Sequence, residues 1–449
     1  MSSIDWFSLI IFVVSLGLMI FLHELGHFLA SRFFGIEVEE FGFGLPPRIL
    51  GFWRAAGYML INGRRVEIPR NFDRGLDWQR IVRKPVTLTA ESVNGALVLR
   101  SLEVGELTEA YAPSTSLRAG SAPGPVKVEG VVTEVHPGTL LSLNWLPIGG
   151  FVRPKGENDP RVAGGLAAAS PWKRIAVLFA GPVMNLLTAV ILFGIVTGMQ
   201  GIEVPGPVHL EQVSPASPAQ QAGLQVNDRV LAVNGQSVQS AETLISTIQA
   251  NLDKPIDLLI ERDGKQIHIT VTPDSHRSKE QGAVGIVMAP ATRPATVLEI
   301  ARNGVVMMGL QAAGLVYLPV ALLQGVIQPD QARLVGLKGI FDMVNQAVQR
   351  DVSTREGVAS AGGSPAQPTN WTLYIMAMLS VSLGVINLFP IPALDGGRIL
   401  FTLPEILFHR RVPMEFENMV NGVAMLLLIA FMLFINVMDF IKPAPPFLP

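Results

Sequence analysis

The sequence contains no cysteine, and charged residues make up only 16% of its 449 residues. The absence of cysteine excludes disulfides, cysteine-type zinc sites and thiol catalysis, so any metal must be held by histidine and carboxylate groups. The formal net charge is -2, and the chain therefore lacks the overall basic charge with which nucleic-acid-binding proteins contact phosphates. We expect no nucleic-acid partner.

Hydrophobic residues, by contrast, make up 49% of the chain, and the mean hydropathy is +0.40. An ordinary soluble domain carries roughly 25% charged residues, so this composition predicts a protein embedded in a membrane. Four segments are apolar and long enough to cross a bilayer, which takes about 20 residues per helix. They cover residues 6–29, 174–200, 371–392 and 419–438. The first carries Asp5 in place of a basic start, so we expect a retained helix rather than a signal peptide.

A fifth uncharged stretch, 303–329, is also long enough to cross. Arginines follow the first segment (Arg32, Arg48, Arg54, Arg64, Arg65 and Arg70) and the segment 371–392 (Arg398, Arg410 and Arg411). The positive-inside rule places both basic loops in the cytoplasm. Because a full crossing by 303–329 would force one of them outside, we expect this stretch to be re-entrant or interfacial. The prediction is four spans with both termini outside.

The stretch 203–290 predicts a small mixed domain of strands and helices between the second and third spans. A helix-like run near 240–251 precedes strand-like alternation at 256–261 and 266–272. The region 54–139 is harder to interpret. It combines β-like runs at 86–89, 96–99 and 126–135 with a loop rich in proline, serine and glycine at 112–125.

His23, Glu24 and His27 form the pattern His-Glu-x-x-His in the first apolar segment. Residues four apart lie on the same face of a helix, so both imidazoles can reach one metal ion. Glu24 is offset around the helix, where it can act as a general base toward water. A charge at the centre of a membrane helix costs about 2.5–3.5 kcal/mol, which a bound metal would offset. The alternative is a polar cluster hydrogen-bonded inside a helix bundle.

Asp395 is the candidate for the third ligand that a catalytic zinc site requires. It follows Pro390 and Pro392, which must interrupt a helix, and it precedes Gly396 and Gly397, which permit close or unusual backbone geometry. Broken backbone at membrane depth is tolerated where protein or a water-filled cavity surrounds it. The alternative is a surface aspartate at the end of a helix.

Three segments resemble, in the same order, the signature regions of the site-2 proteases. They are His23 to His27, Gly181 to Asn185 and Asn387 to Gly397. The resemblance implies Zn²⁺ held by His23, His27 and Asp395, with Glu24 activating water. It further implies that Asn387 and Pro392 help to hold the substrate.

For Asn387, as for Asn185, an interhelical hydrogen bond is the alternative role. The stretch 203–290 resembles a bacterial PDZ domain, which places the chain with the regulator-of-sigma-E-protease group. Segments 41–47 and 143–151 resemble the two arms of that group's membrane-dipping β loop, here separated by a long insertion.

The expected fold is a polytopic α-helical membrane protein of about four transmembrane helices, with an inserted α+β PDZ domain and a β-rich membrane-associated loop. The expected parts are 1–35 (first helix with the His-Glu-x-x-His motif), 36–172 (cytoplasmic-side β loop with its insertion), 173–201 (second helix), 203–290 (PDZ domain), 291–370 (re-entrant or interfacial helical region), 371–397 (third helix with the Leu-Asp-Gly motif) and 398–449 (cytoplasmic loop and fourth helix).

The resemblance implies an intramembrane zinc endopeptidase of the bacterial inner membrane with an extracytoplasmic PDZ domain. It would cleave transmembrane segments of single-span proteins, such as anti-sigma factors or remnant signal peptides. Its PDZ domain would bind a peptide or chain end by β-augmentation, or act only as a steric filter. The rival hypotheses are a catalytically silent PDZ adaptor, which predicts a broken metal set, and a metal transporter, which predicts paired broken helices.

Overall fold

The computed structural model describes residues 3–72, 76, 78–104, 126–277, 282–327, 335–361 and 370–442. The loop expected at 112–125 lies outside these residues. The chain divides into two units, each described by itself below. One unit comprises residues 9–188 and 380–435, and the other comprises 1–8, 189–379 and 436–449.

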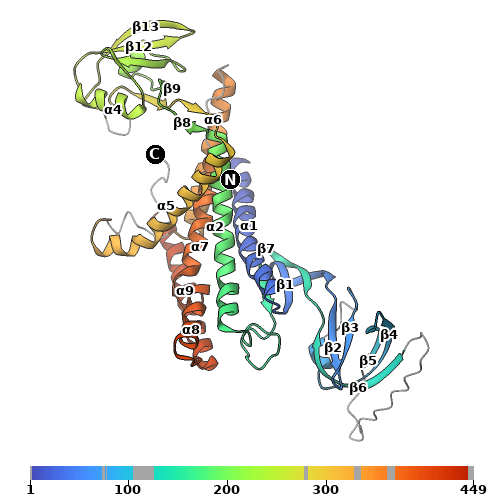
Figure 1. Cartoon of the computed structure of the whole chain (residues 1–449). Coiled ribbons are helices and arrows are strands. Elements are labelled where there is room, and N and C mark those ends of the chain that lie inside the picture. The colour runs from blue at the N-terminus through green and yellow to red at the C-terminus, as the bar shows by residue number, and fades with distance from the viewer. Residues whose placement is uncertain are drawn as a thin grey trace. The chain divides into compact units, whose positions relative to one another are not determined.

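Five helices in the described residues are long and apolar enough to cross a membrane (Figure 1). They are α1 (Ser3–Phe33), α2 (Pro171–Gln200), α5 (Val297–Leu323), α7 (Trp371–Leu388) and α9 (Met414–Ile441). Four of them contain or overlap the predicted spans, and α5 covers most of the ambiguous stretch 303–329. The number of spans, four or five, stays a prediction.

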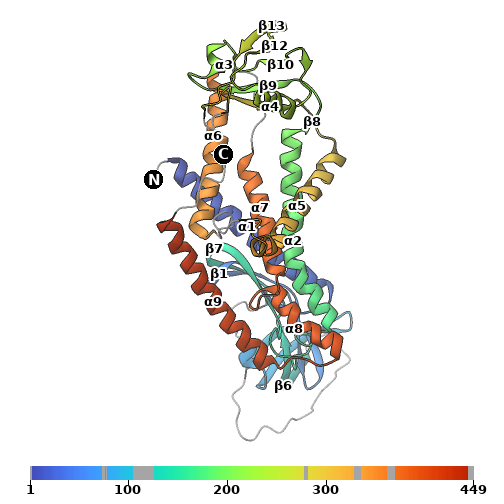
Figure 2. The ribbon, with the colours of Figure 1, turned by 90° about the vertical axis from the view of Figure 1, so that its left-hand side faces the viewer.

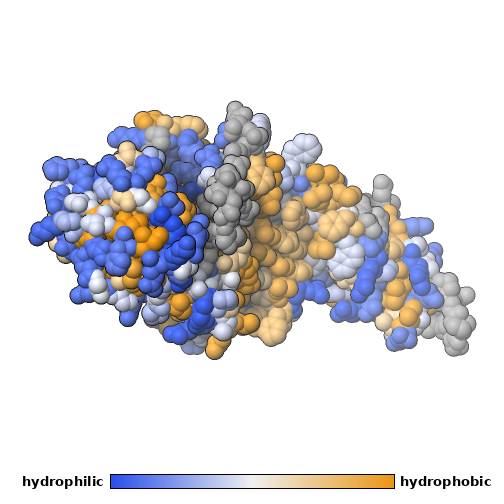
Figure 3. All heavy atoms as spheres, turned by 90° about the horizontal axis from the view of Figure 1, so that it is seen from above, coloured by the Kyte–Doolittle hydropathy of each residue, from blue (hydrophilic) through white to orange (hydrophobic). Residues whose placement is uncertain are grey.

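The outer surfaces of these helices require an apolar solvent. In α9, Leu426 is 70% exposed and Phe434 is 61% exposed. Exposing apolar surface to water costs roughly 25 cal/mol per Å², and contiguous apolar patches of this kind mark membrane or protein contacts. Hydrophobic residues gather over the helical part of the face seen in Figure 3, whereas hydrophilic residues predominate over the strand-rich parts. The protein is a membrane protein.

A long antiparallel ribbon follows α1 directly. It pairs β1 (Val38–Arg54) with β7 (Leu140–Pro154) (Figure 2). The ring of Phe41 on β1 stacks against those of Phe21 and Phe28 on α1, at centroid distances of 5.3 and 4.9 Å. A Cβ at Gly149 on β7 would come within 2.4 Å of Ile20 on α1, so glycine permits this close approach. The ribbon therefore lies against the helix that carries the His-Glu-x-x-His motif.

A closed five-stranded barrel is inserted between the two arms of the ribbon (Figure 1). Its strands, in the order in which they pair, are β2 (Gly57–Ile61), β3 (Arg64–Ile68), β5 (Ala96–Val104), β4 (Pro85–Val93) and β6 (Val126–His136). A short helix, η1 (Trp78–Ile81), adds Trp78 to a buried core that includes Met59, Leu88 and Leu99. The three predicted β-like runs are confirmed as β4, β5 and β6. The closure into a barrel was not predicted.

A partly buried ionic network joins the two ends of the ribbon to the barrel. The Glu37 carboxylate accepts hydrogen bonds from Tyr58 Oη at 2.6 Å and Lys155 Nζ at 2.7 Å, and Lys155 also donates to Glu134 at 2.9 Å. Burial by itself would raise the pKa of Glu37, but the hydrogen bonds from Lys155 and Tyr58 outweigh it, and the pKa lies below its ordinary value. The carboxylate thus stays ionised and fixes the barrel to the base of the ribbon.

The second unit contains the mixed domain that the sequence predicts at 203–290 (Figure 1). Its sheet has the order β13 (Lys265–Val271), β12 (Ile256–Arg262), β10 (Arg229–Val233), β9 (Val208–Val213) and β14 (Ile286–Ala289), with β11 (Gln236–Ser237) on β10. The helices α3 (Pro218–Gln221) and α4 (Ala241–Ala250) begin at caps provided by Ser217 and Ser240. We call residues 203–290 the PDZ-like domain.

Two short strands flank this domain, β8 (Ile202–Glu203) and β15 (Thr292–Arg293), which pair with each other. After α5 comes α6 (Leu337–Ala361), whose first turn is held by the end of α9. Asp439 accepts hydrogen bonds from the backbone N–H groups of Gly336 and Gly339, at 2.8 and 3.2 Å. The Asp439 carboxylate thus satisfies unpaired donors at the start of α6.

Candidate metal centre

His23 and His27 lie one turn apart on α1, as their spacing predicts, and point toward the same place. Their Nε2 atoms are 3.1 Å apart. The side chain of His23 is 9% exposed and that of His27 is 12% exposed. Gly26 lies between them and allows α2 to approach, because a Cβ there would come within 2.3 Å of the Ala180 carbonyl oxygen. The two imidazoles are therefore held where α1 and α2 pack closely.

Asp395 reaches the same place from a break in the chain. The helix α7 ends at Leu388, four residues before the predicted end of the third span, and a separate helix, α8 (Asp395–Phe408), begins at Asp395 itself (Figure 2). The aspartate thus opens a new helix rather than ending the third span, and residues 398–408 are helical rather than loop. Ala393, inside the break, has a positive φ of 74°.

The two glycines after Asp395 make this break compact. A Cβ at Gly396 would come within 2.2 Å of the Phe389 carbonyl oxygen, and one at Gly397 within 2.3 Å of the Ile391 carbonyl oxygen. Any other residue would push α8 away from the preceding turn. These glycines therefore fix where the Asp395 carboxylate lies.

The three side chains form a triangle of ligand atoms. Asp395 Oδ2 lies 3.1 Å from His23 Nε2 and 3.4 Å from His27 Nε2, and the two nitrogens are 3.1 Å apart. In a tetrahedral zinc site with ligand bonds of about 2.0–2.1 Å, neighbouring ligand atoms are about 3.3 Å apart. The triangle fits that spacing, and two histidines with one carboxylate form a known catalytic zinc ligand set.

The other ring nitrogen of each histidine contacts a group that orients it. His27 Nδ1 donates to the Val177 carbonyl oxygen at 2.8 Å, which leaves the Nε2 lone pair for a metal. His23 Nδ1 lies 3.1 Å from the side-chain amide of Asn185, which is fully buried. Asn185 Oδ1 has no hydrogen-bond partner in the part of the chain that the structure describes. Because amide oxygen and nitrogen are assigned from the hydrogen-bond network, exchanging them lets Asn185 accept from His23 Nδ1–H and leaves Nε2 for a metal.

Gly181 leaves open the space next to the ligand atoms. A Cβ on this residue of α2 would come within 2.3 Å of His27 Nε2 and 2.8 Å of His23 Nε2. The sequence had marked Gly181 only as part of a family motif, without a role. A requirement for space beside two nitrogens from another helix has no local signal in the sequence, so this function could not be predicted from it.

The side chain of Glu24 contacts the ribbon. Its Oε2 accepts a hydrogen bond from the backbone N–H of Val152 on β7 at 3.0 Å. The predicted general base is therefore tethered to the strand that lies against α1. This contact between the motif and the β loop was not predicted.

The two predicted substrate-binding residues lie in α7 and in the break that follows it. Asn387 Nδ2 donates to the Leu383 carbonyl oxygen of its own helix at 3.0 Å, which is neither a contact with the triangle nor the interhelical bond considered as the alternative. Pro392 lies in the break, against Gly397. Their role toward substrate stays a prediction.

The family model of peptidase family M50 matches residues 11–67 and 126–431. The match includes all three members of the triangle, Glu24 and Asn185, and it leaves out the barrel strands β4 and β5. The chain belongs to peptidase family M50. This M50 protein is a zinc-dependent metalloendopeptidase of the site-2 protease family, and zinc is its cofactor.

The M50 relatives extend over nearly the full chain. The protein is 28% identical to zinc metalloprotease RasP of Geobacillus kaustophilus, over 97% of this chain and 98% of the relative. It is 27% identical to the regulator of sigma-W protease RasP of Bacillus subtilis, over 94% and 96%. Among solved structures it is similar to a PDZ domain of an SdrC-like protein from Listeria monocytogenes, at 17% identity and a TM-score of 0.18, over 20% of this chain and 92% of that one.

Replacing Asn185 of this M50 peptidase with leucine is expected to weaken zinc binding by about 10–100-fold, the usual effect of removing a hydrogen-bond partner of a metal-bound histidine. The imidazole of His23 would lose the group that fixes its tautomer and ring orientation. Competition for zinc against a chromophoric chelator measures the effect. Ser380→Ala is the matched control, because Ser380 donates only to the backbone oxygen of Asn185. Unchanged zinc affinity in Asn185→Leu would contradict the assignment.

Proposed function

We propose that this protein is an intramembrane endopeptidase that cleaves the transmembrane segments of single-span membrane proteins. One observation carries the proposal. Two histidines and a glutamate lie within α1, a candidate membrane span, and a partly buried aspartate meets the two histidines from the break after α7, another candidate span. Ionisable groups are costly in a membrane and mark functional sites there. A metal triangle on such helices acts on substrates that enter the membrane.

His23, His27 and Asp395 would hold the metal, with Val177 and Asn185 fixing the orientation of the two imidazoles. When bound, zinc supplies a Lewis acid that polarises the scissile carbonyl and lowers the pKa of water toward about 7. Glu24 takes the proton from the attacking water and passes it to the leaving amine. Its hydrogen bond from the Val152 N–H holds the carboxylate in position.

Substrate binding must compensate for the unwinding of a helix. Every backbone group in a membrane helix is paired internally, so a cleavable segment needs new partners for the freed groups. The Asn387 amide offers a donor and an acceptor for this purpose. Its bond to Leu383 would then open when substrate binds. Pro392, in the adjacent break, would line the same substrate-binding site.

The natural substrates belong to the classes of anti-sigma factors or remnant signal peptides. The name of the Bacillus subtilis relative, a regulator of sigma-W protease, supports the first class. The arginine-rich loops favour a multi-pass protein of a bacterial cell membrane with the PDZ-like domain outside the cytoplasm. There the domain would bind a peptide or chain end of the substrate, or exclude folded substrates.

The test is cleavage of a model single-span protein by the purified full chain in detergent, followed by mass spectrometry of the products. We expect a new terminus inside the apolar segment. Cleavage should stop when a zinc chelator removes the metal and return when zinc is added back. A matched substrate whose apolar segment is replaced by a soluble linker should stay intact. Cleavage only outside the apolar segment would contradict the proposal.

A further inference from the structure

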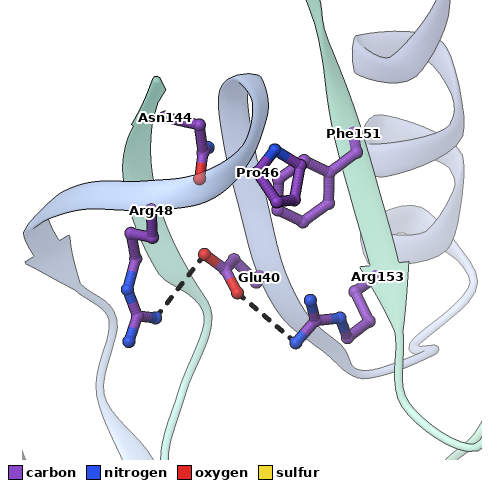
Figure 4. A pocket seen from close by; sticks show the side chains of 6 residues that line it. All are labelled: Glu40, Pro46, Arg48, Asn144, Phe151 and Arg153. Atoms are coloured by element: carbon purple, nitrogen blue, oxygen red, sulfur yellow. Dashed lines mark ion pairs between the residues drawn. The ribbon is translucent and has the colours of Figure 1, made fainter. Parts of the chain in front are cut away.

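A pocket of about 340 Å³ lies in the β1–β7 ribbon, and its lining includes no member of the metal triangle. It is lined by Glu40, Pro46, Arg48, Asn144, Phe151 and Arg153 (Figure 4). All six residues belong to the two arms of the ribbon. The pocket is thus built by the ribbon alone.

A buried carboxylate between two arginines forms the floor of this pocket (Figure 4). The Glu40 side chain is only 8% exposed, whereas those of Arg48 and Arg153 are about half exposed, at 49% and 54%. The guanidinium groups approach Glu40 at 3.6 and 3.5 Å. These distances exceed the 2.7–3.2 Å of an N–H···O hydrogen bond. Both arginines therefore keep donors for another acceptor.

Two buried oxygens of the pocket have no hydrogen-bond partner among the described residues. They are Glu40 Oε1, which Arg48 approaches only to 3.6 Å, and Asn144 Oδ1, and both residues are more than nine-tenths buried. The amide of Asn144 is held by the Phe43 carbonyl oxygen at 3.2 Å and Ser142 Oγ at 3.3 Å, so Oδ1 is fixed. Buried polar groups are nearly always paired, and an unpaired one calls for an explanation.

The chemistry of the pocket is complementary to a group that carries both an anion and hydrogen-bond donors. Two guanidinium groups suit a phosphate, which accepts several charge-assisted hydrogen bonds. The carboxylate and the amide oxygen suit a primary ammonium group, which has three N–H donors. One headgroup, phosphoethanolamine, has both. A quaternary ammonium has no N–H and could not pair with Glu40 or Asn144.

The two strands that line the pocket also carry exposed apolar residues that suit acyl chains. On β1, Ile49 and Leu50 follow Arg48 and are 56% and 55% exposed. On β7, Leu143 and Trp145 flank Asn144 and are 40% and 69% exposed. Exposed apolar residues next to a charged pocket are typical of a membrane contact, with the aromatic ring at headgroup level.

We propose that this ribbon pocket binds the headgroup of a phosphatidylethanolamine molecule of the membrane. Arg48 and Arg153 hold the phosphate, and Glu40 and Asn144 accept hydrogen bonds from the ammonium group. The acyl chains lie along the exposed apolar residues of the two arms. The bound lipid fixes the depth of the ribbon in the membrane, and the proposal does not depend on which substrates are cleaved.

The test is lipid binding to the purified full chain in a neutral detergent, measured by native mass spectrometry with phosphatidylethanolamine and phosphatidylcholine of identical acyl chains. The wild type is expected to bind phosphatidylethanolamine about tenfold more tightly, the difference expected for losing charge-assisted hydrogen bonds. Glu40→Gln should bind both lipids alike. Arg48→Ala combined with Arg153→Ala should weaken the binding of both lipids. Arg48→Lys combined with Arg153→Lys should restore phosphate binding. Arg64→Ala, an exposed arginine of the barrel, is the matched control and should bind as the wild type does.

Equal binding of the two lipids by the wild type would overturn the proposal, as would unchanged lipid binding in a folded double alanine variant. Soluble phosphoethanolamine should not displace the lipid at a comparable concentration, and displacement would overturn the assignment to a membrane lipid. A different outcome is that the double alanine variant loses the binding of a model transmembrane peptide and keeps lipid binding. That result would overturn the proposal and identify the pocket as a peptide subsite. The thermal unfolding midpoint of each variant confirms that it is folded.

Discussion

Replacing Glu24 with glutamine is expected to lower the rate of peptide cleavage by at least about 10²–10⁴-fold, the usual contribution of a general base. Glutamine keeps the shape of the side chain, and its oxygen can still accept the hydrogen bond from the Val152 N–H. It cannot take a proton from water. Zinc content should therefore stay at the wild-type level while cleavage of the model substrate is lost.

The matched control is Glu91→Gln, which changes a glutamate of the barrel that pairs with Arg100 on an exposed surface. Cleavage and zinc content are expected to match the wild type in this control. Single-turnover kinetics separate the chemical step from substrate binding. Wild-type cleavage by Glu24→Gln would refute the role of Glu24 as the general base.

The substitution Gly181→Ala is expected to remove both zinc and activity, although it adds only one methyl group. That methyl would lie 2.3 Å from His27 Nε2 and 2.8 Å from His23 Nε2, in the space next to these two metal-ligand atoms. Zinc affinity should fall by on the order of 100-fold or more, the upper range for perturbing a metal ligand. Alanine favours a helix over glycine by about 1 kcal/mol, so α2 itself should not be weakened.

Gly314→Ala in α5 serves as the control, because a Cβ there meets no atom within 4 Å. Zinc content is measured by atomic absorption and helicity by circular dichroism for both variants. If Gly181→Ala bound zinc and cleaved substrate like the wild type, the metal could not lie between the three side chains described above.

Most of the metal triangle could be predicted from the sequence because its signals are local. The spacing of His23 and His27 is one helical turn, and the prolines and glycines around Asp395 predict a break in the helix. The buried partners of the histidines were harder to assign. The contacts of Asn185 and Val177 depend on the register between α1 and α2, which tertiary packing decides and local pattern does not.

Two strands of the PDZ-like domain, β12 and β13, and three of the barrel, β4, β5 and β6, were predicted for the same reason, since local patterns of apolar residues mark them. The closure of the barrel could not be predicted in this way. It requires β2 to pair with β6, far along the chain, and β3 to lie parallel to β5. Such pairings depend on residues distant in sequence. Likewise, α5 carries no charge after Arg302, and the re-entrant or interfacial placement that charge asymmetry predicts for it stays a prediction.

The barrel also affects how the ribbon forms. Arg54 on β1 pairs with Leu140 on β7, although the whole barrel, residues 57–136, separates them in sequence. The barrel's first and last strands are neighbours, with Tyr58 opposite His136, so the chain leaves the barrel beside the point where it entered. Joining distant segments carries a loop-closure entropy cost that grows with the length of the loop. Once folded, the barrel acts as a short connector, and a long-range strand pairing becomes in effect a hairpin.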